Sequence, residues 1–458
     1  MHHATPSGIR RAGALSIMTA LVAAACGGGG SPSPEASAAS APPAATETPA
    51  ATATPVASEA PTGGTVTVIG TWSGSEQESF LAMVKPFEDQ TGIKVQYTGT
   101  RDINAVLSTG VASGILPDLA GLPGPGQMAE YAKAGALLPL DDVLDVATYK
   151  AETSPGLVAL GTVDGKITGV FIKAAVKGLI WYNPKVYTGG VPTSWDDLQL
   201  KARTAAAAIA GGKAKPWCVG LESGAASGWP GTDWIEDFVL RQSGPDVYDQ
   251  WIAGTLKWTS PEIRQAFEAF GTVVADDAVY GGAKTVNATN FGDGGNPLFT
   301  DPPGCVLHHQ ASFITDFFKK QGGAQDGDFA FFPFPDINPA YTGAVEGAGD
   351  LFGMFHDTPA ARALIKYLVT ADAQAIWVGR GGALSANNKV SNYPDDASKN
   401  SAAILANAKI FRFDASDAMP QAMNDAFWKA IVDFTKDQSK LDSILANLDS
   451  IQASAYGG

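Results

Sequence analysis

The stretch from Thr65 to Leu122 alternates between short runs of β-branched residues and helical patterns. Thr65 to Gly70 reads as a strand, and apolar residues at helical spacing follow it as far as Phe87. Thr91-Gly92 ends that helix, after which a strand over 93–97, a helix over 103–111 and a strand over 117–120 repeat the pattern. Short connections of this kind predict an open, parallel α/β sheet, which binds ligands at the carboxyl ends of its strands.

A second α/β unit is predicted from about residue 173, as a chain of 458 residues is long for one domain. An Asp164-Gly165 turn precedes apolar strands over 168–173 and 176–182. Thr193-Ser194 then caps a helix that begins at Trp195. The remaining elements are expected to be mostly helical, over 360–368, 372–378, 402–408 and 419–434.

The N-terminus has the pattern of a signal peptide over residues 1–26. Arg10 and Arg11 precede an apolar run over 12–25 that is short for a membrane span. The small residues before Cys26 resemble the lipobox of bacterial lipoproteins, in which this cysteine receives the lipid, although Ala23 stands where that box usually has Leu. A simple signal peptide cut nearby is the alternative. Residues 27–63, rich in Gly, Ser, Pro, Ala and Thr, are predicted to be a disordered linker.

Composition and cysteine content narrow the possible partners. The formal net charge of −15, without any visible basic stripe, argues against nucleic acid. Cys218 and Cys305 both begin strand-like runs, so adjacent strands would allow a disulfide, which we favour over two buried free thiols. Neither has a CxxC partner, and the paired His308 and His309 have no third ligand nearby, so no metal is expected.

Several motifs resemble the carbohydrate-specific extracellular solute-binding proteins of ABC importers. They are Gly70-Thr71-Trp72, Asp164-Gly165-Lys166-Ile167 and the run from Gly178 to Pro184. The stretches 221–234, 308–313 and 347–353 resemble the α-glucoside-binding branch.

The resemblance implies an α/β fold of the two-lobe periplasmic-binding-protein type (type II, maltodextrin-binder-like) with hinge crossovers. Lobe one would comprise 64–172 plus 346–386, and lobe two 173–345 plus 387–458. It also implies a monomer, lipid-anchored outside the cytoplasm, that closes on a small oligosaccharide and delivers it to ABC permease subunits in the membrane. No cofactor is expected, and no Walker loop is present in the sequence.

The candidate sugar-binding residues are those that supply aromatic faces or planar polar groups near the expected ligand edge. Sugars offer apolar C–H faces and hydroxyls, so such groups must converge. The candidates are Trp72, Arg101, Asp118, Gln127, Lys173, Glu222, Trp229, Asp233, His309, Gln310, Asp350 and Trp428. Trp428 comes from resemblance, because the tryptophan of an Ala-Phe-Trp run stacks on sugar in related maltodextrin binders. Structural roles stay open: a turn cap for Asp118, an ion pair for Lys173, a helix cap for Asp233 and core packing for Trp428.

Two other functional classes have weaker support. A secreted glycoside hydrolase needs two carboxylates flanking one bond, and Glu222 with Asp233 or Asp233 with Glu236 would be the pairs to consider. A serine hydrolase needs a Gly-x-Ser-x-Gly elbow, a spacing that the stretch 224–228 does not fit. A binding protein rather than an enzyme is therefore expected, and a sugar-sensing receptor with the same fold remains an alternative.

Overall fold

The computed structural model describes residues 63–209 and 211–457. The predicted signal peptide over 1–26, the predicted lipidation of Cys26 and nearly all of the predicted linker over 27–63 lie outside these residues. Within them, none of the helices has both the length and the apolar character that a membrane span requires.

The first sheet begins with the three parallel strands that the sequence predicts. β1 (Thr65–Gly70) lies between β2 (Lys94–Gly99) and β3 (Leu119–Leu122) and is parallel to both. β11 (Ala344–Met354) joins β3 in the antiparallel direction, and β12 (Ile410–Phe413) runs parallel to the start of β11. The carboxyl ends of β1, β2 and β3 therefore share one edge, where Trp72, Arg101 and Pro123 follow.

The second sheet has the order β10-β7-β9-β8. β8 (Lys215–Cys218) and β9 (Cys305–Gln310) are parallel, whereas β7 (Leu179–Tyr182) is antiparallel to β9 and to β10 (Ala330–Pro333). A disulfide joins Cys218 to Cys305, with their Cα atoms 5.6 Å apart, and ties β8 to β9.

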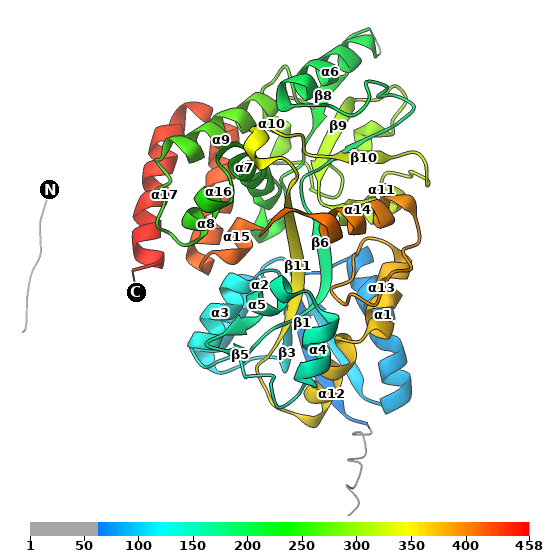
Figure 1. Cartoon of the computed structure of the whole chain (residues 1–458), viewed down its shortest axis with the longest axis vertical. Coiled ribbons are helices and arrows are strands. Elements are labelled where there is room, and N and C mark those ends of the chain that lie inside the picture. The colour runs from blue at the N-terminus through cyan, green and yellow to red at the C-terminus, as the bar shows by residue number, and fades with distance from the viewer. Residues whose placement is uncertain (1–62, 210, 458) are drawn as a thin grey trace, which may run out of the picture. The chain divides into compact units, whose positions relative to one another are not determined.

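Helices cover the two sheets separately and give two lobes (Figure 1). The first lobe, around β1 to β3, has a core of residues such as Phe80, Val84 and Leu364, and the second, around β7 to β10, has one that includes Trp217, Phe238 and Phe270. The helices of the first lobe are α1 (Ser75–Thr91), α2 (Ile103–Ser113), α3 (Pro125–Lys133), α4 (Val146–Glu152), α5 (Pro155–Leu160), α12 (Pro359–Leu368) and α13 (Ala371–Arg380).

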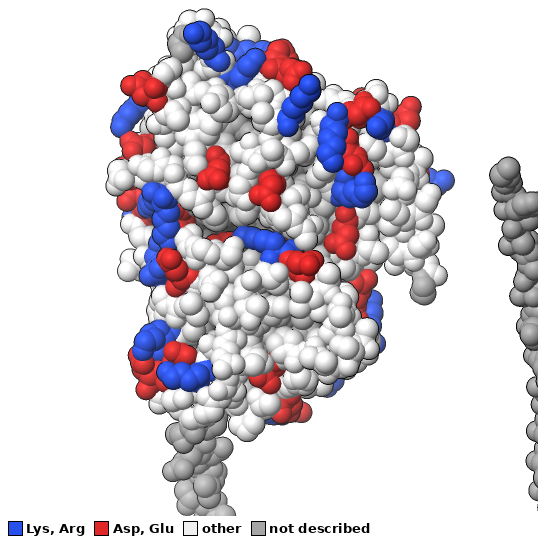
Figure 2. All heavy atoms as spheres, turned by 180° about the vertical axis from the view of Figure 1, so that it is seen from behind, with Lys and Arg blue, Asp and Glu red and all other residues white. Residues whose placement is uncertain are grey.

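The remaining helices lie around the second sheet or between the lobes (Figure 1). They are α6 (Trp195–Ala208), α7 (Trp229–Ser243), α8 (Pro245–Ile252), α9 (Pro261–Val273), α10 (Ala283–Val286), α11 (Thr315–Lys320), α14 (Asp396–Asn407), α15 (Ala415–Ala418), α16 (Gln421–Lys436) and α17 (Leu441–Ala455). In the view of Figure 2, acidic and basic side chains lie in small mixed groups separated by neutral surface, so that face has no basic stripe of the kind that nucleic acid requires.

Two strands cross between the lobes beside one another. β6 (Val170–Val176) pairs antiparallel with β11 over residues 347–352, and every residue of β6 is buried. After β6 the chain passes through Lys177-Gly178 into β7 of the second sheet. These strands are the hinge crossovers that the resemblance implies, and the fold is the expected two-lobe α/β type.

The strand boundary near the hinge differs from the prediction. The sequence indicated strands over 168–173 and 176–182, but the break falls at Lys177-Gly178, and Lys173 lies inside β6. Gly178 has φ 65°, and a Cβ there would stand 2.4 Å from a carboxylate oxygen of Asp237. The turn therefore requires glycine, which sets the break three residues later than hydrophobicity suggested.

Several local predictions are confirmed. Asp164 and Gly165 both have positive φ and join β4 (Thr162–Val163) to β5 (Lys166–Ile167). Gly92 ends α1 with a left-handed cap, and the Ser194 hydroxyl accepts a hydrogen bond from the Asp197 backbone amide at the start of α6. The lobe boundaries at 172/173, 345/346 and 386/387 stay predictions.

Candidate functional site

A cavity lies between the lobes, beside the crossover strands. Its volume is about 890 Å³ when space open to solvent is counted. Side chains of both lobes and of the crossovers line it. The lining residues are Thr71, Trp72, Glu76, Arg101, Ile103, Asn104, Pro123, Lys173, Ala175, Lys177, Ala226, Trp229, Asp233, Phe291, Phe313, Ala348, Gly349, Asp350, Asp414, Ser416, Asp417 and Trp428.

The first sheet places three of these residues by its topology. Trp72, Arg101 and Pro123 follow the carboxyl ends of β1, β2 and β3, and all of them line the cavity. This is the edge at which open α/β sheets present their loops to ligands. The predicted position of the site therefore agrees with the structure.

An ion cluster forms the first-lobe side of the cavity. The ammonium of Lys173 lies 2.9 Å from Glu76 Oε1 and 3.4 Å from Asp350 Oδ2, and Arg101 lies 3.1 Å from Glu76 Oε2. Burial by itself would raise the pKa of Glu76, but Lys173 and Arg101 reverse this effect and hold it below its usual value. Burial raises the pKa of Asp350 despite the nearby Lys173. Two cations and two acids thus balance within a buried network.

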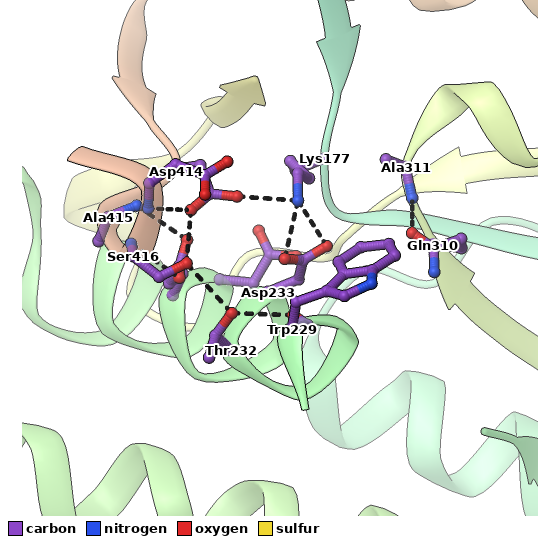
Figure 3. A network of polar contacts seen from close by, with 12 residues as sticks. Lys177, Trp229, Thr232, Asp233, Gln310, Ala311, Asp414, Ala415 and Ser416 are labelled. Carbon is purple, nitrogen blue, oxygen red and sulfur yellow. Dashed lines mark hydrogen bonds and ion pairs between the residues drawn. The ribbon is translucent and has the colours of Figure 1, made fainter. Parts of the chain in front are cut away.

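A second ion cluster surrounds Lys177 at the hinge (Figure 3). Its ammonium lies 2.8 Å from both carboxylate oxygens of Asp233, near the start of α7, and 2.8 Å from Asp414 Oδ2, just before α15. Glu236 accepts hydrogen bonds from the backbone amides of Ala415 (2.9 Å) and Ser416 (3.2 Å). Glu236 of α7 therefore fixes the start of α15 (Ala415–Ala418).

The acids of this second cluster titrate unequally. Burial raises the pKa of Asp233 to about 7 although Lys177 opposes it. Asp414, for which burial is again the largest influence, has a lowered pKa because Lys177, Ser416 and a backbone amide stabilise its charge. Burial also opposes the charge on Lys177, but Asp233 and Asp414 raise its pKa well above the usual value. Lys177 is thus charged at neutral pH, and Asp414 is its principal anion.

The acidic groups around Lys177 are close enough together for a metal site, but the charge of the lysine already balances theirs. Carboxylate oxygens of Asp233, Glu346 and Asp414 lie within 4.8 Å of one another. The ammonium of Lys177 is already bound to two of these three acids, at 2.8 Å. These residues fit a lysine as the resident cation, and we assign no metal to them.

Aromatic rings form much of the second-lobe wall. Trp229 contacts Phe291 edge-on, with ring centroids 5.2 Å apart, and lies 6.0 Å from Phe313. Gly228, with φ 109°, begins α7 against Trp428, and a Cβ there would lie 2.2 Å from the Trp428 carbonyl oxygen. This close approach brings Trp229 and Trp428 into one wall. Such rings suit the apolar C–H faces of a sugar.

Two indole N–H groups at the cavity have no hydrogen-bond partner within the described part of the chain. They belong to Trp72, which is 1% exposed, and Trp428, which is 8% exposed. Buried donors are paired in almost all folded proteins. Both residues line the cavity, so their unpaired donors fit a ligand that supplies acceptors.

Seven of the twelve candidate residues line the cavity: Trp72, Arg101, Lys173, Trp229, Asp233, Asp350 and Trp428. Lys173 and Asp233 are also in ion pairs, the structural role that was left open for Lys173. Asp233 does not cap α7, because it lies inside the helix and its carboxylate binds Lys177.

The structure places the other five candidates outside the cavity lining. Asp118 precedes β3, so it lies at the amino end of a parallel strand, and its carboxylate accepts bonds of 2.8 Å from the Thr67 amide and hydroxyl. Glu222 accepts bonds of 2.7 Å from the Gly224 amide and the Asn290 side chain. Both carboxylates therefore organise local backbone.

The remaining three are buried with protein partners. Gln127 donates to Asn104 Oδ1 at 3.0 Å and so supports a cavity residue from behind. His309 lies 2.6 Å from Asp237 and stacks on Trp234, while burial lowers the pKa of His309. The Gln310 side chain accepts a bond of 2.8 Å from the Ala311 amide. The side chains of His309 and Gln310 are therefore engaged with protein groups and do not line the cavity.

Sequence reasoning missed Glu76, Lys177, Asp414, Asp417 and the rings of Phe291 and Phe313, all of which line the cavity. For Lys177 a signal existed, because a lysine beside apolar strands needs a partner, the same argument that selected Lys173. Glu76 stands in the first turn of α1, beside the expected ligand edge. For Asp414 and Asp417 no local signal existed, since their position depends on the pairing of β12 with β11.

Comparisons with known proteins agree with this architecture. Residues 73–375 match the family described as bacterial extracellular solute-binding proteins. The chain is 38% identical over 376 residues to the osmoprotective compounds-binding protein GgtB of Synechocystis, which covers 81% of this chain and 88% of that protein. It is 37% identical over 398 residues to the α-glucosides-binding periplasmic protein AglE of Rhizobium meliloti, with 83% and 85% covered.

Solved structures share the fold at low sequence identity. A chitin oligosaccharide binding protein superposes with a TM-score of 0.75 at 20% identity, covering 86% of this chain and 99% of the other. The maltose-bound MalE3 of T. maritima gives a TM-score of 0.65 at 19% identity, with 85% and 99% covered. The family match and the two relatives together establish that this chain belongs to the bacterial extracellular solute-binding proteins.

Proposed function

We propose that this protein captures a small α-glucoside outside the cytoplasm and delivers it to the membrane subunits of an ABC importer. The observation that carries the proposal is the cavity between the lobes, where unpaired indole donors, aromatic rings and charged hydrogen-bonding groups converge. The α-glucoside class is supported by the likeness to AglE, whose name gives that ligand. The solved relatives named for chitin oligosaccharide and maltose have the same fold.

Closure of the lobes is the proposed mechanism. Contacts already bridge them: Asn104 of α2 donates to Asp425 of α16 at 3.1 Å, and the Arg101 guanidinium lies 4.9 Å from the ring centre of Phe291. A ligand held by Trp72 on one side and Trp229 on the other adds contacts that exist only in the closed form. The ligand shifts the population toward the closed form, to an extent set by the difference between its affinities for the open and closed states. The permease then recognises the closed shape.

We further propose that the protein acts as a lipid-anchored monomer, divided into lobes at the predicted boundaries. The small residues before Cys26 and the Gly/Ser/Pro-rich stretch after it support an anchor followed by a tether. Metabolic labelling with a palmitate analogue tests this: the native chain should be labelled, and a Cys26→Ala variant should not. Label on the variant, or none on the native chain, would contradict lipidation at Cys26. Light scattering of the soluble form should give the mass of one chain.

Binding without chemical conversion is part of the proposal. A glycosidase needs two carboxylates on either side of the scissile bond, whereas Asp233 is bound to Lys177 and Glu222 to Gly224 and Asn290. Protein incubated with a disaccharide should return it intact by chromatography. The appearance of monosaccharide, absent with a Glu236→Gln or Asp233→Asn variant, would overturn this part.

A thermal-shift panel of about twenty saccharides tests the function as a whole. A ligand at 100 times its dissociation constant should add about 2.7 kcal/mol to the free energy of unfolding. We expect α-linked disaccharides to give the largest shifts, and β-linked glucosides and free glucose to give smaller ones. Stabilisation by none of the saccharides, together with stabilisation by a peptide or a metal ion, would refute the proposal.

A further inference from the structure

Acidic groups outnumber basic ones in the cavity lining. The lining has three basic residues, Arg101, Lys173 and Lys177, and five acidic ones: Glu76, Asp233, Asp350, Asp414 and Asp417. Four of the five acids are paired, Glu76 and Asp350 with Lys173, and Asp233 and Asp414 with Lys177. Among the described residues, the lining therefore has one acid that forms no ion pair with a lining cation.

That acid is Asp417, in α15. Among residues 63–209 and 211–457 it forms no ion pair, and its carboxylate accepts one long hydrogen bond, 3.4 Å, from the amide of Asn424. Its backbone amide donates to Asp414 Oδ1 at 3.0 Å, which fixes the residue in place. Gly124 packs so closely that a Cβ there would lie 2.3 Å from the Asp417 carbonyl oxygen. The carboxylate is thus held at the cavity wall with spare hydrogen-bonding capacity.

We propose, building on the function above, that the cavity selects glycosides by charge, with Asp417 binding a protonated amino group on the ligand. An amino-substituted glycoside supplies the cation that the lining lacks. A sugar phosphate or a uronate would add negative charge to a lining that already has an excess of acids, and it is rejected.

The groups around Asp417 make the interaction dependent on protonation. Besides burial, the charges that act on it are Asp414, which raises its pKa, Lys177, which lowers it, and Asp233 and Asp350, which raise it further, so its pKa lies well above the usual value. These surroundings therefore disfavour the charged form of Asp417 in the ligand-free protein. An ammonium group stabilises the carboxylate, so its binding lowers this pKa and favours release of a proton.

The charged groups on the other elements packed against α15 are engaged with partners of their own. On α3, Glu130 accepts a bond from the Gln421 amide, and on α8, Asp249 pairs with Arg412 of β12. On α16, Asp425 accepts bonds from Asn104 and Gln421. Each of these charged groups has its own partner, so within the described part of the chain a ligand cation has no ion pair of Asp417 to displace.

Calorimetry with three matched disaccharides tests this inference. The probes are trehalose or maltose, whichever gives the larger thermal shift, its derivatives with an amino group at C2 or C6, and its 6-phosphate. We expect an amino derivative to bind at least tenfold more tightly than the neutral sugar, and the phosphate at least tenfold more weakly. Titrations in buffers of different ionisation enthalpy should show proton release with the amino sugar and little with the neutral one.

The Asp417→Asn variant should lose the preference for the amino derivative and the proton release. Asp246→Asn, an exposed acid on α8 outside the cavity, is the matched control and should change nothing. If the neutral sugar binds but no amino derivative is preferred, or if Asp417→Asn keeps the preference, the charge selection is refuted and the proposed function stands. If none of the sugars binds, both fail.

Discussion

Replacement of Lys177 by methionine tests the energetic role of the hinge cluster. Its ammonium is held 2.8 Å from Asp233 and Asp414, and all three side chains are at most 6% exposed. Methionine keeps most of the apolar volume but leaves two buried carboxylates without their cation. Removing one partner from a buried ion pair costs about 3–5 kcal/mol. We expect a loss of this size in the free energy of unfolding at pH 8.

The loss in the free energy of unfolding of Lys177→Met should depend on pH in a defined direction. Without Lys177, the pKa values of Asp233 and Asp414 rise in the folded variant, which then binds more protons than its unfolded chain as the pH falls. The free energy of unfolding of the variant therefore increases toward low pH relative to wild type. The difference between the two proteins should be largest at pH 8 and clearly smaller at pH 5.

Urea denaturation followed by tryptophan fluorescence provides the measurement. Lys185→Met is the matched control: Lys185 also pairs with an aspartate, Asp328 at 2.6 Å, but its side chain is 72% exposed. Such a pair contributes about 0–1 kcal/mol. A loss below about 1 kcal/mol for Lys177→Met, or an equal loss at pH 5 and pH 8, would refute the account of the cluster.

Three further predictions concern pH, the disulfide and the aromatic wall. Burial raises the pKa of Asp233 to about 7, so this group binds more protons in the folded protein than in the unfolded chain between about pH 4 and pH 7. The free energy of unfolding should therefore fall from pH 5 to pH 8, and less steeply in Asp233→Asn; an equal slope in the two proteins would contradict this. Reducing the Cys218–Cys305 bond, which spans 87 residues, should lower the free energy of unfolding by about 2–5 kcal/mol. Urea denaturation with and without reductant measures this loss, and an unchanged midpoint would refute the prediction. Trp428→Phe removes a donor that has no partner in the described residues. Calorimetry should therefore show a sugar affinity about fivefold weaker, a loss near 1 kcal/mol, while the urea midpoint stays nearly unchanged. An affinity equal to that of the wild type would contradict the role of Trp428.

The elements of the first sheet were predictable because their signals are local. β-branched runs, helical spacing and Gly92 locate β1, α1 and β2 within a few residues. Parallel order then places Trp72 and Arg101 at the ligand edge without knowledge of distant contacts. The same logic put Asp118 at the wrong end of β3, because this strand begins two residues later than expected.

The parts that escaped prediction depend on contacts between distant segments. Asp414 and Asp417 reach the cavity because β12 pairs with β11 and Glu236 fixes the start of α15. His309 was selected because it stands at the end of a strand, but β9 lies between β7 and β8 and the ring is buried against Trp234. No pattern within a short window of sequence contains this information.

A crystal structure of the protein with a bound α-linked disaccharide tests the central claim most directly. The account predicts the sugar between the lobes, with one ring against Trp229 and acceptors within hydrogen-bond distance of the indole nitrogens of Trp72 and Trp428. A sugar bound elsewhere, or a cavity that stays empty at saturating ligand while those two N–H groups contact only protein, would contradict it.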